Sequence, residues 1–169
     1  MIKHITYLII IILISSCNQN PIDKWQNYDE SDEIKTNSNL ENKRLQFKRI
    51  QSISNDKNNL INGFENEISN FVDSEYDLVK ALVYEKSIPE IQQNIIDGKL
   101  TYYKLSLFYL SRIYLIEFDQ ERYLNSIISI NKNILKEAKR KDKVKNTNIY
   151  SLYGIPILLK DNIGFEGLP

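Results

Sequence analysis

Apolar residues in the middle of the chain recur at helical spacing. Between residues 60 and 72 they lie one, three or four positions apart, which places them on one face of a helix (Leu60, Ile61, Phe64, Ile68, Phe71 and Val72). A similar spacing continues through residues 78–83, and a further helix is predicted within residues 40–54. We therefore expect residues 40–86 to form a helical N-terminal extension.

Sharper helix signals follow from residue 87 onwards. The sequence Ser-Ile-Pro-Glu at 87–90 matches a capping box with Pro in the first helical turn, Gly98 provides a C-terminal stop, and Thr101 is the next N-cap candidate. These signals predict two helices joined by a short turn. Residues 124–130 favour a strand or an extended segment. Residues 132–143 predict a basic helix, whose Lys and Arg residues we interpret as a solvated face and whose apolar face is Ile134, Leu135 and Ala138.

The last apolar run predicts a buried strand over residues 154–160. Ile157, Leu158 and Leu159 are consecutive, as in strands covered on both faces, and Pro156 fits only the start or edge of such a strand. Lys160 follows directly. A Lys at this position either extends into solvent or, if it is desolvated, has a lowered pKa and can act as a general base.

The N-terminus has the form of a secretory signal. A positive start is followed by an uncharged run from Ile5 to Ser16, which is shorter than the roughly 20 apolar residues of a membrane-spanning helix. The end of this run, Ile-Ser-Ser before Cys17, resembles the bacterial lipobox. This resemblance implies removal of residues 1–16, lipid attachment at Cys17, and a lipoprotein anchored to a membrane of the bacterial cell envelope. The alternative is a short buried helix with an incidental Cys.

A polar stretch separates the signal from the predicted helices. Low hydrophobicity over residues 17–39 predicts a flexible tether, in which Trp25 and Tyr28 are the candidates to dock back onto the body. The acidic cluster at 29–33 is interpreted as solvated and not as a metal site.

Composition narrows the possible functions. The 169 residues carry 22 basic and 22 acidic side chains, a balance that argues against a nucleic-acid partner. A single Cys and a single His exclude a disulfide framework and argue against a structural zinc site. No two of the five Gly residues are adjacent, so there is no Gly-rich phosphate loop, and no cofactor is expected. His4 lies in the signal, so catalysis in the mature chain cannot use His.

The run from Gly154 to Asn162 (Gly-Ile-Pro-Ile-Leu-Leu-Lys-Asp-Asn) closely resembles the strand that carries the catalytic Lys of the amidase signature family. Upstream pieces fit the same family in order: Asp-Gly-Lys-Leu-Thr at 97–101, Tyr-Leu-Ser-Arg-Ile at 109–113, Leu-Asn-Ser-Ile-Ile at 124–128, and Ala138 with Asp142. The resemblance covers residues 87–169, roughly half of the chain.

The resemblance implies a Ser–cis-Ser–Lys triad that hydrolyses the C–N bond of a small amide or peptide amide. By motif position, Lys160 is the catalytic base. Gly154, Pro156, Asp161 and Asn162 take structural roles around it. Tyr153 departs from the family, which often has His at this position.

The two triad serines have no counterpart in the chain. In the family they follow the Lys strand in Gly-rich stretches, and none of the serines present maps to them. We therefore expect residues 87–169 to be the incomplete N-terminal part of an α/β domain, namely helices and the first strands of an α/β/α sandwich. This part alone should be predominantly helical and inactive. It should also expose an apolar face at residues 154–160. The alternatives are an inactive degraded gene product and a non-catalytic helical envelope lipoprotein.

Overall fold

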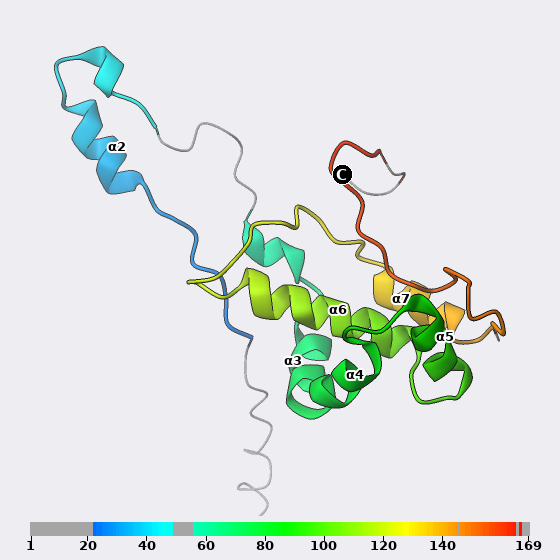
Figure 1. Cartoon of the computed structure of the whole chain (residues 1–169). Helices are drawn as coiled ribbons and strands as arrows, with labels where there is room; N and C mark the ends of the chain where they lie inside the picture. The colour runs from blue at the N-terminus through cyan, green and yellow to red at the C-terminus, as the bar shows by residue number, and fades with distance from the viewer. Residues whose placement is uncertain (1–21, 49–55, 145, 165, 167–169) are drawn as a thin grey trace, which may run out of the picture.

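The computed structural model describes residues 22–48, 56–144, 146–164 and 166, and this part of the chain is predominantly helical (Figure 1). Its described residues form no β-strand. In chain order the elements are α2 (Ser31–Ser38), the 3₁₀ helices η1 (Lys43–Leu45) and η2 (Lys57–Leu60), α3 (Glu65–Ser74), α4 (Tyr76–Val83), α5 (Ile88–Ile96), α6 (Tyr102–Glu117) and α7 (Ile134–Lys141).

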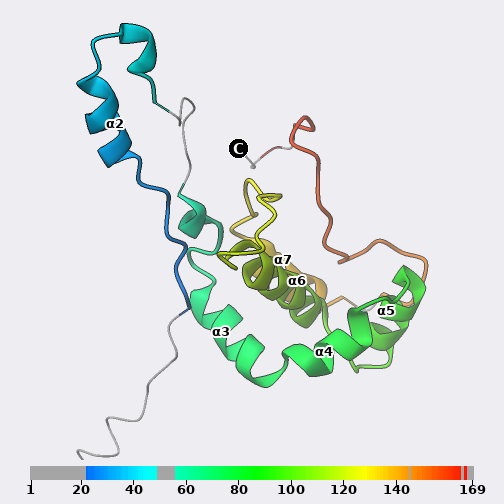
Figure 2. The ribbon, with the colours of Figure 1, turned by 60° about the vertical axis from the view of Figure 1, so that its left-hand side comes forward.

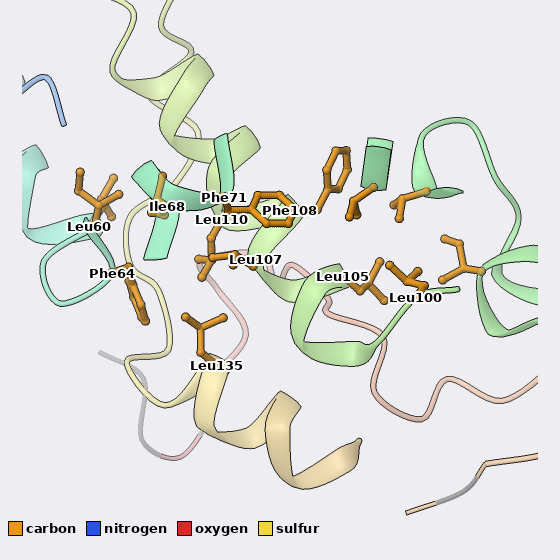
Figure 3. Packing of buried hydrophobic residues seen from close by; sticks show 14 of the residues in the cluster. Leu60, Phe64, Ile68, Phe71, Leu100, Leu105, Leu107, Phe108, Leu110 and Leu135 are labelled. Carbon is orange, nitrogen blue, oxygen red and sulfur yellow. The ribbon is translucent and has the colours of Figure 1, made fainter. Parts of the chain in front are cut away.

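Helix α6 is the centre of the fold. It packs against α3, α4 and α7, and it is apolar on several sides because neighbours cover it on several sides. Figure 3 shows four of its core side chains among those of α3 and α7 (Leu105, Leu107, Phe108 and Leu110). The core therefore lies between this helix and the elements wrapped around it.

The apolar stripe predicted over residues 60–72 is confirmed. Ile68 and Phe71 are buried on α3, and the turn before the helix buries Leu60, Ile61 and Phe64. The pattern at 78–83 is confirmed in part, because α4 buries Val79 and Val83 but leaves Leu78 exposed.

The predicted hairpin of α5 and α6 is confirmed together with its turn signals. The backbone N–H of Ser87 donates to the Glu90 carboxylate at 2.8 Å, which caps the start of α5. Gly98 has φ +74°, the left-handed conformation that ends helices, and the Thr101 hydroxyl accepts from the Lys104 N–H at 3.1 Å.

The basic helix is also confirmed as α7, with Leu135 and Ala138 buried against the core. Asp142, just after its last turn, reaches the start of α6. Its carboxylate accepts from the backbone N–H groups of Tyr102 at 2.7 Å and Tyr103 at 3.1 Å. The end of α7 thus caps the central helix, where a carboxylate is favoured.

Two predictions for residues 17–54 are wrong where the structure describes them. Residues 40–48 contain only the turn η1, and the α-helix lies earlier, at Ser31–Ser38, inside the predicted tether. Because α2 buries no residue, no apolar pattern could indicate it. Figures 1 and 2 both show α2 standing away from the helical body.

The first described residues of the predicted tether dock onto the helical body. Trp25 packs edge-on against Tyr123, with ring centroids 4.6 Å apart, and the backbone N–H of Trp25 donates to the Asn58 side-chain oxygen at 2.9 Å. The N–H of Asp23 donates to the Tyr114 hydroxyl at 3.0 Å. Docking of Trp25 is therefore confirmed, whereas Tyr28 is exposed.

The strand expected at 124–130 is not formed. Asn125 takes a left-handed φ of +53°, which interrupts an extended backbone, and the N–H groups of Asn125 and Ser126 donate to the Glu117 carboxylate. The segment is a loop that folds around this carboxylate, while Ile127 and Ile130 rest against the core.

The strand expected at 154–160 is not formed either, because no neighbouring strand pairs with it in the described part of the chain. Ile157 and Leu158 are 69% and 77% exposed, so the expected exposed apolar face is confirmed. The segment runs away from the helices in both views (Figures 1 and 2).

The predicted N-terminal signal, residues 1–16, and Cys17 lie outside the described residues. Among the helices that are described, none combines the length and the apolar character that crossing a membrane requires.

Candidate functional site

Lys160 lies at the end of the extended segment 155–160, and its side chain is exposed. Its carbonyl accepts from the Ile163 N–H at 2.8 Å, which closes a turn over the exposed residues Asp161 and Asn162. Pro156, at the start of the segment, is half-buried. The described residues therefore hold the backbone around Lys160 in a turn but do not enclose its amine.

No serine is brought to the Lys160 amine by hydrogen bonding within the described part of the chain. Ser151, the nearest in sequence, is used locally: its hydroxyl accepts from the Tyr153 N–H at 3.0 Å. The structure thus shows Lys160 without the two hydroxyl groups that the triad needs.

A buried amide, that of Gln92 on α5, helps to hold the segment that leads to Lys160. The Gln92 Nε2 donates to the carbonyls of Ser151 at 2.7 Å and Tyr153 at 2.9 Å. Its Oε1 accepts from the Tyr102 hydroxyl at 2.9 Å. Because Gln92 is fully buried, its side-chain amide would destabilise the fold if it lacked hydrogen-bond partners, and these three bonds supply them. The loop before the Lys segment is therefore fixed to both helices of the hairpin.

Gly154 makes this attachment possible. It has φ +74°, and a Cβ atom there would lie 2.7 Å from Cγ of the Tyr102 ring and closer still to other atoms of that ring. Tyr153 beside it packs edge-on against Tyr102 at 5.5 Å and carries the Lys141 ammonium 4.3 Å above its ring. The structural role expected for Gly154 thus has a specific physical cause, namely the close approach of backbone to an aromatic ring.

Gln92 and Tyr102 were missed by sequence reasoning, although a signal was present. Gln92 lies four positions after Ile88 and one after the buried Ile91, which places this amide on the apolar face of its helix. A polar residue at such a position indicates a buried hydrogen-bond hub.

Glu117 forms a second buried polar centre, at the opposite end of α6. Its carboxylate accepts from the Ser126 hydroxyl at 2.7 Å and from the backbone N–H groups of Ser126 and Asn125, and it pairs with Lys57 at 3.0 Å. Burial alone would raise the pKa of Glu117, but the hydrogen bonds from Ser126 and the Lys57 ammonium lower it overall.

The Lys57 ammonium is in turn enclosed by aromatic rings. It lies 4.3 Å from the centroid of the Trp25 ring and 4.5 Å from that of Tyr123. Four donors contact the Glu117 carboxylate, and the rings of Trp25 and Tyr123 cover the Lys57 ammonium, so neither charged group is open to a substrate. The centre fixes residues 22–28 and 123–126 to α6.

No group of three or more His, Cys, Asp or Glu side chains that could hold a metal ion occurs among the residues that the structure describes. Within the acidic cluster, Asp29 accepts from the backbone and the hydroxyl of Ser31, and these hydrogen bonds lower the pKa of its carboxyl.

Comparison of the chain with protein-family models, with curated proteins and with solved structures finds no match.

Proposed function

We propose that this chain supplies the catalytic Lys and the helical platform of a lipid-anchored amidase that hydrolyses the C–N bond of small amides or peptide amides. Lys160 would take a proton from a bridging Ser, which takes one from a nucleophilic Ser. The nucleophile attacks the amide carbonyl, the amine leaves with a proton, and water hydrolyses the acyl-enzyme. The two serines must come from polypeptide other than these 169 residues.

The observation that carries the proposal is the motif itself, with Gly154 six residues before Lys160. A catalytic base has to be held within a fraction of an ångström of its working position, and residues held by packing and hydrogen bonds achieve this best. Gly154 supports the proposal because its positive φ and its contact with Tyr102 tie the start of the motif to the buried core.

The unpaired segment 155–160 also supports the proposal. Its backbone groups are free of strand partners in the described part of the chain, and Ile157 and Leu158 face solvent. Pairing with additional strands would satisfy these backbone groups, and a layer packed on the resulting sheet would cover the side chains and enclose the Lys160 amine. Enclosure would favour the neutral amine that a general base requires.

The test begins with the reading frame that follows Pro169 in the gene. A frame that encodes a Gly- and Ser-rich stretch allows the extended chain to be produced and assayed on simple amides and aryl amides. Turnover is expected in the extended chain, and Lys160→Ala should lower kcat at least about 1,000-fold, since the triad acts as one unit. The 169-residue chain alone should show no turnover.

The matched control is Lys43→Ala, which removes an exposed Lys outside the motif. It should retain full activity. Equal activity of Lys160→Ala and Lys43→Ala would refute the catalytic role, and turnover by the 169-residue chain above its Lys160→Ala variant would refute the requirement for further serines.

The exposure of Lys160 favours one competing function, a non-catalytic helical envelope lipoprotein in which the motif has no chemical role. A stop in the frame directly after Pro169, together with a stable monomeric product that captures one reproducible partner, would support that function instead.

A further inference from the structure

A row of basic side chains follows one face of α7. Five exposed basic residues lie along one side of the helix and its flanks (Lys132, Lys136, Lys139, Arg140 and Lys143). Each lies three or four positions from at least one other, and Lys139 and Arg140 are adjacent. We call these five residues the basic ridge. It borders an open groove of about 480 Å³ whose other wall comes from Gly63, Phe64 and Glu67.

Charge is concentrated here although the chain as a whole is neutral. The five cations of the basic ridge share the groove with a single acid, Glu67. The one acid within α7, Glu137, lies 3.9 Å from Arg140 and does not balance the others. Like charges three or four positions apart repel and destabilise a helix, so the ridge has an electrostatic cost that a bound anion would remove.

One end and the middle of the basic ridge are held in place by contacts with the fold. The Lys132 ammonium donates to the carbonyls of Asn59 at 2.5 Å and Asn62 at 3.2 Å, and it lies 5.5 Å from the centre of the Phe64 ring. Lys139 lies 4.5 Å above the ring of Tyr103. Leu135, buried at the base of the groove, fixes α7 to the core (Figure 3).

From this geometry we propose that the basic ridge is a docking surface for anionic phospholipid headgroups, which orients the body of the protein on the membrane to which the lipid anchor of the proposed function would hold it. The ridge extends over about 15 Å of helix axis, too far for one phosphate to meet all five cations. A membrane presents phosphates side by side over this distance, and each basic residue near such a surface gains about fivefold in binding. The proposal does not depend on any chemistry of Lys160.

The test uses the full chain attached to vesicles of phosphatidylcholine alone, or of phosphatidylcholine and phosphatidylglycerol in equal parts. Lysines are acetylated briefly, and the rate at each Lys is read by mass spectrometry. On anionic vesicles, acetylation of Lys136, Lys139 and Lys143 should be at least about fivefold slower than on neutral vesicles. Salt near 1 M should remove the difference, because it screens charge over a few ångströms.

A charge variant distinguishes the ridge from a general effect of basic residues. Lys136→Gln, Arg140→Gln and Lys143→Gln together should abolish the protection of Lys139 on anionic vesicles. The matched control removes the same number of charges from three exposed residues elsewhere in the chain (Lys35, Lys43 and Arg44) and should leave that protection intact. Circular dichroism checks that both variants fold.

Equal acetylation of the ridge on both kinds of vesicle would overturn the proposal. So would equal loss of protection in the charge variant and its control. Protection by a soluble polyanion such as heparin, without protection by anionic vesicles, would show that the ridge binds a polyanion other than a lipid surface and would likewise refute it. All of these results are independent of amidase assays.

Discussion

Substitution of Gly154 by Ala tests whether the close approach of this backbone to Tyr102 fixes the loop before Lys160. An Ala with φ +74° costs about 1–2 kcal/mol in conformational strain. Its methyl group would also overlap the ring of Tyr102, which is buried and hydrogen-bonded to Gln92 and so cannot turn away. Overpacking of this kind costs about 1–3 kcal/mol, so the loop should lose about 2–5 kcal/mol of attachment free energy.

Hydrogen exchange measures this loss where it occurs. In the loop, the N–H groups of Ser151 and Ile155 donate to backbone carbonyls and that of Tyr153 to a hydroxyl, so these three amides report its attachment. Gly154→Ala should lower their opening free energy by about 2–5 kcal/mol, or abolish their protection, while amides in the middle of α6 stay protected.

Gly98→Ala is the matched control, because Gly98 has the same φ of +74° but no atom within 4 Å of a built Cβ. It should cost only the conformational strain, about 1–2 kcal/mol of global stability, and should leave the loop amides protected. Unchanged loop exchange in Gly154→Ala, or equal acceleration in both variants, would refute the reasoning.

Three further residues give testable outcomes. The pKa of Glu117 is lowered in the folded chain, so the ionised carboxylate stabilises the fold fully above the unfolded pKa near 4.5. This stabilisation is lost as the pH falls below that value. Urea titrations between pH 7 and pH 3 should show the loss in the wild type and a smaller loss in Glu117→Gln. At neutral pH that variant should lose about 3 kcal/mol, because Lys57 stays buried without its anion. Gln92→Leu should cost about 3 kcal/mol in urea denaturation, since its partners lose their hydrogen bonds. Leu158→Lys should reduce concentration-dependent association in analytical ultracentrifugation without lowering stability, and an increase in association would contradict the exposure of this face.

Much of the helical body could be predicted because local signals and apolar spacing agree there. The capping box at Ser87, the stop at Gly98 and the N-cap at Thr101 each act within one helical turn, so a short stretch of sequence contains all the information. The stripe on α3 could be predicted for a similar reason, because its apolar residues recur at helical spacing on the face that packs mainly against α6.

The remaining elements depend on contacts that no local pattern contains. The run at 124–130 has the composition of a strand, but Glu117 on the preceding helix recruits its backbone N–H groups and bends it into a loop. The run at 154–160 has no partner strand among the described residues, so its β-propensity cannot be expressed. Of the predicted site, Gly154 could be inferred from the motif, whereas its dependence on Tyr102 and Gln92 becomes visible only in three dimensions.

The position of Trp25 determines which unfolding step its fluorescence detects. It is the only tryptophan of the chain, and its indole packs against both the ammonium of Lys57 and the ring of Tyr123, at the junction of the docked N-terminal segment with the helical body. Its fluorescence emission therefore reports release of residues 22–28 and not melting of the helices. A fluorescence midpoint that precedes the circular-dichroism midpoint would reveal an unfolding intermediate in which the segment is free while α3 to α7 are still intact.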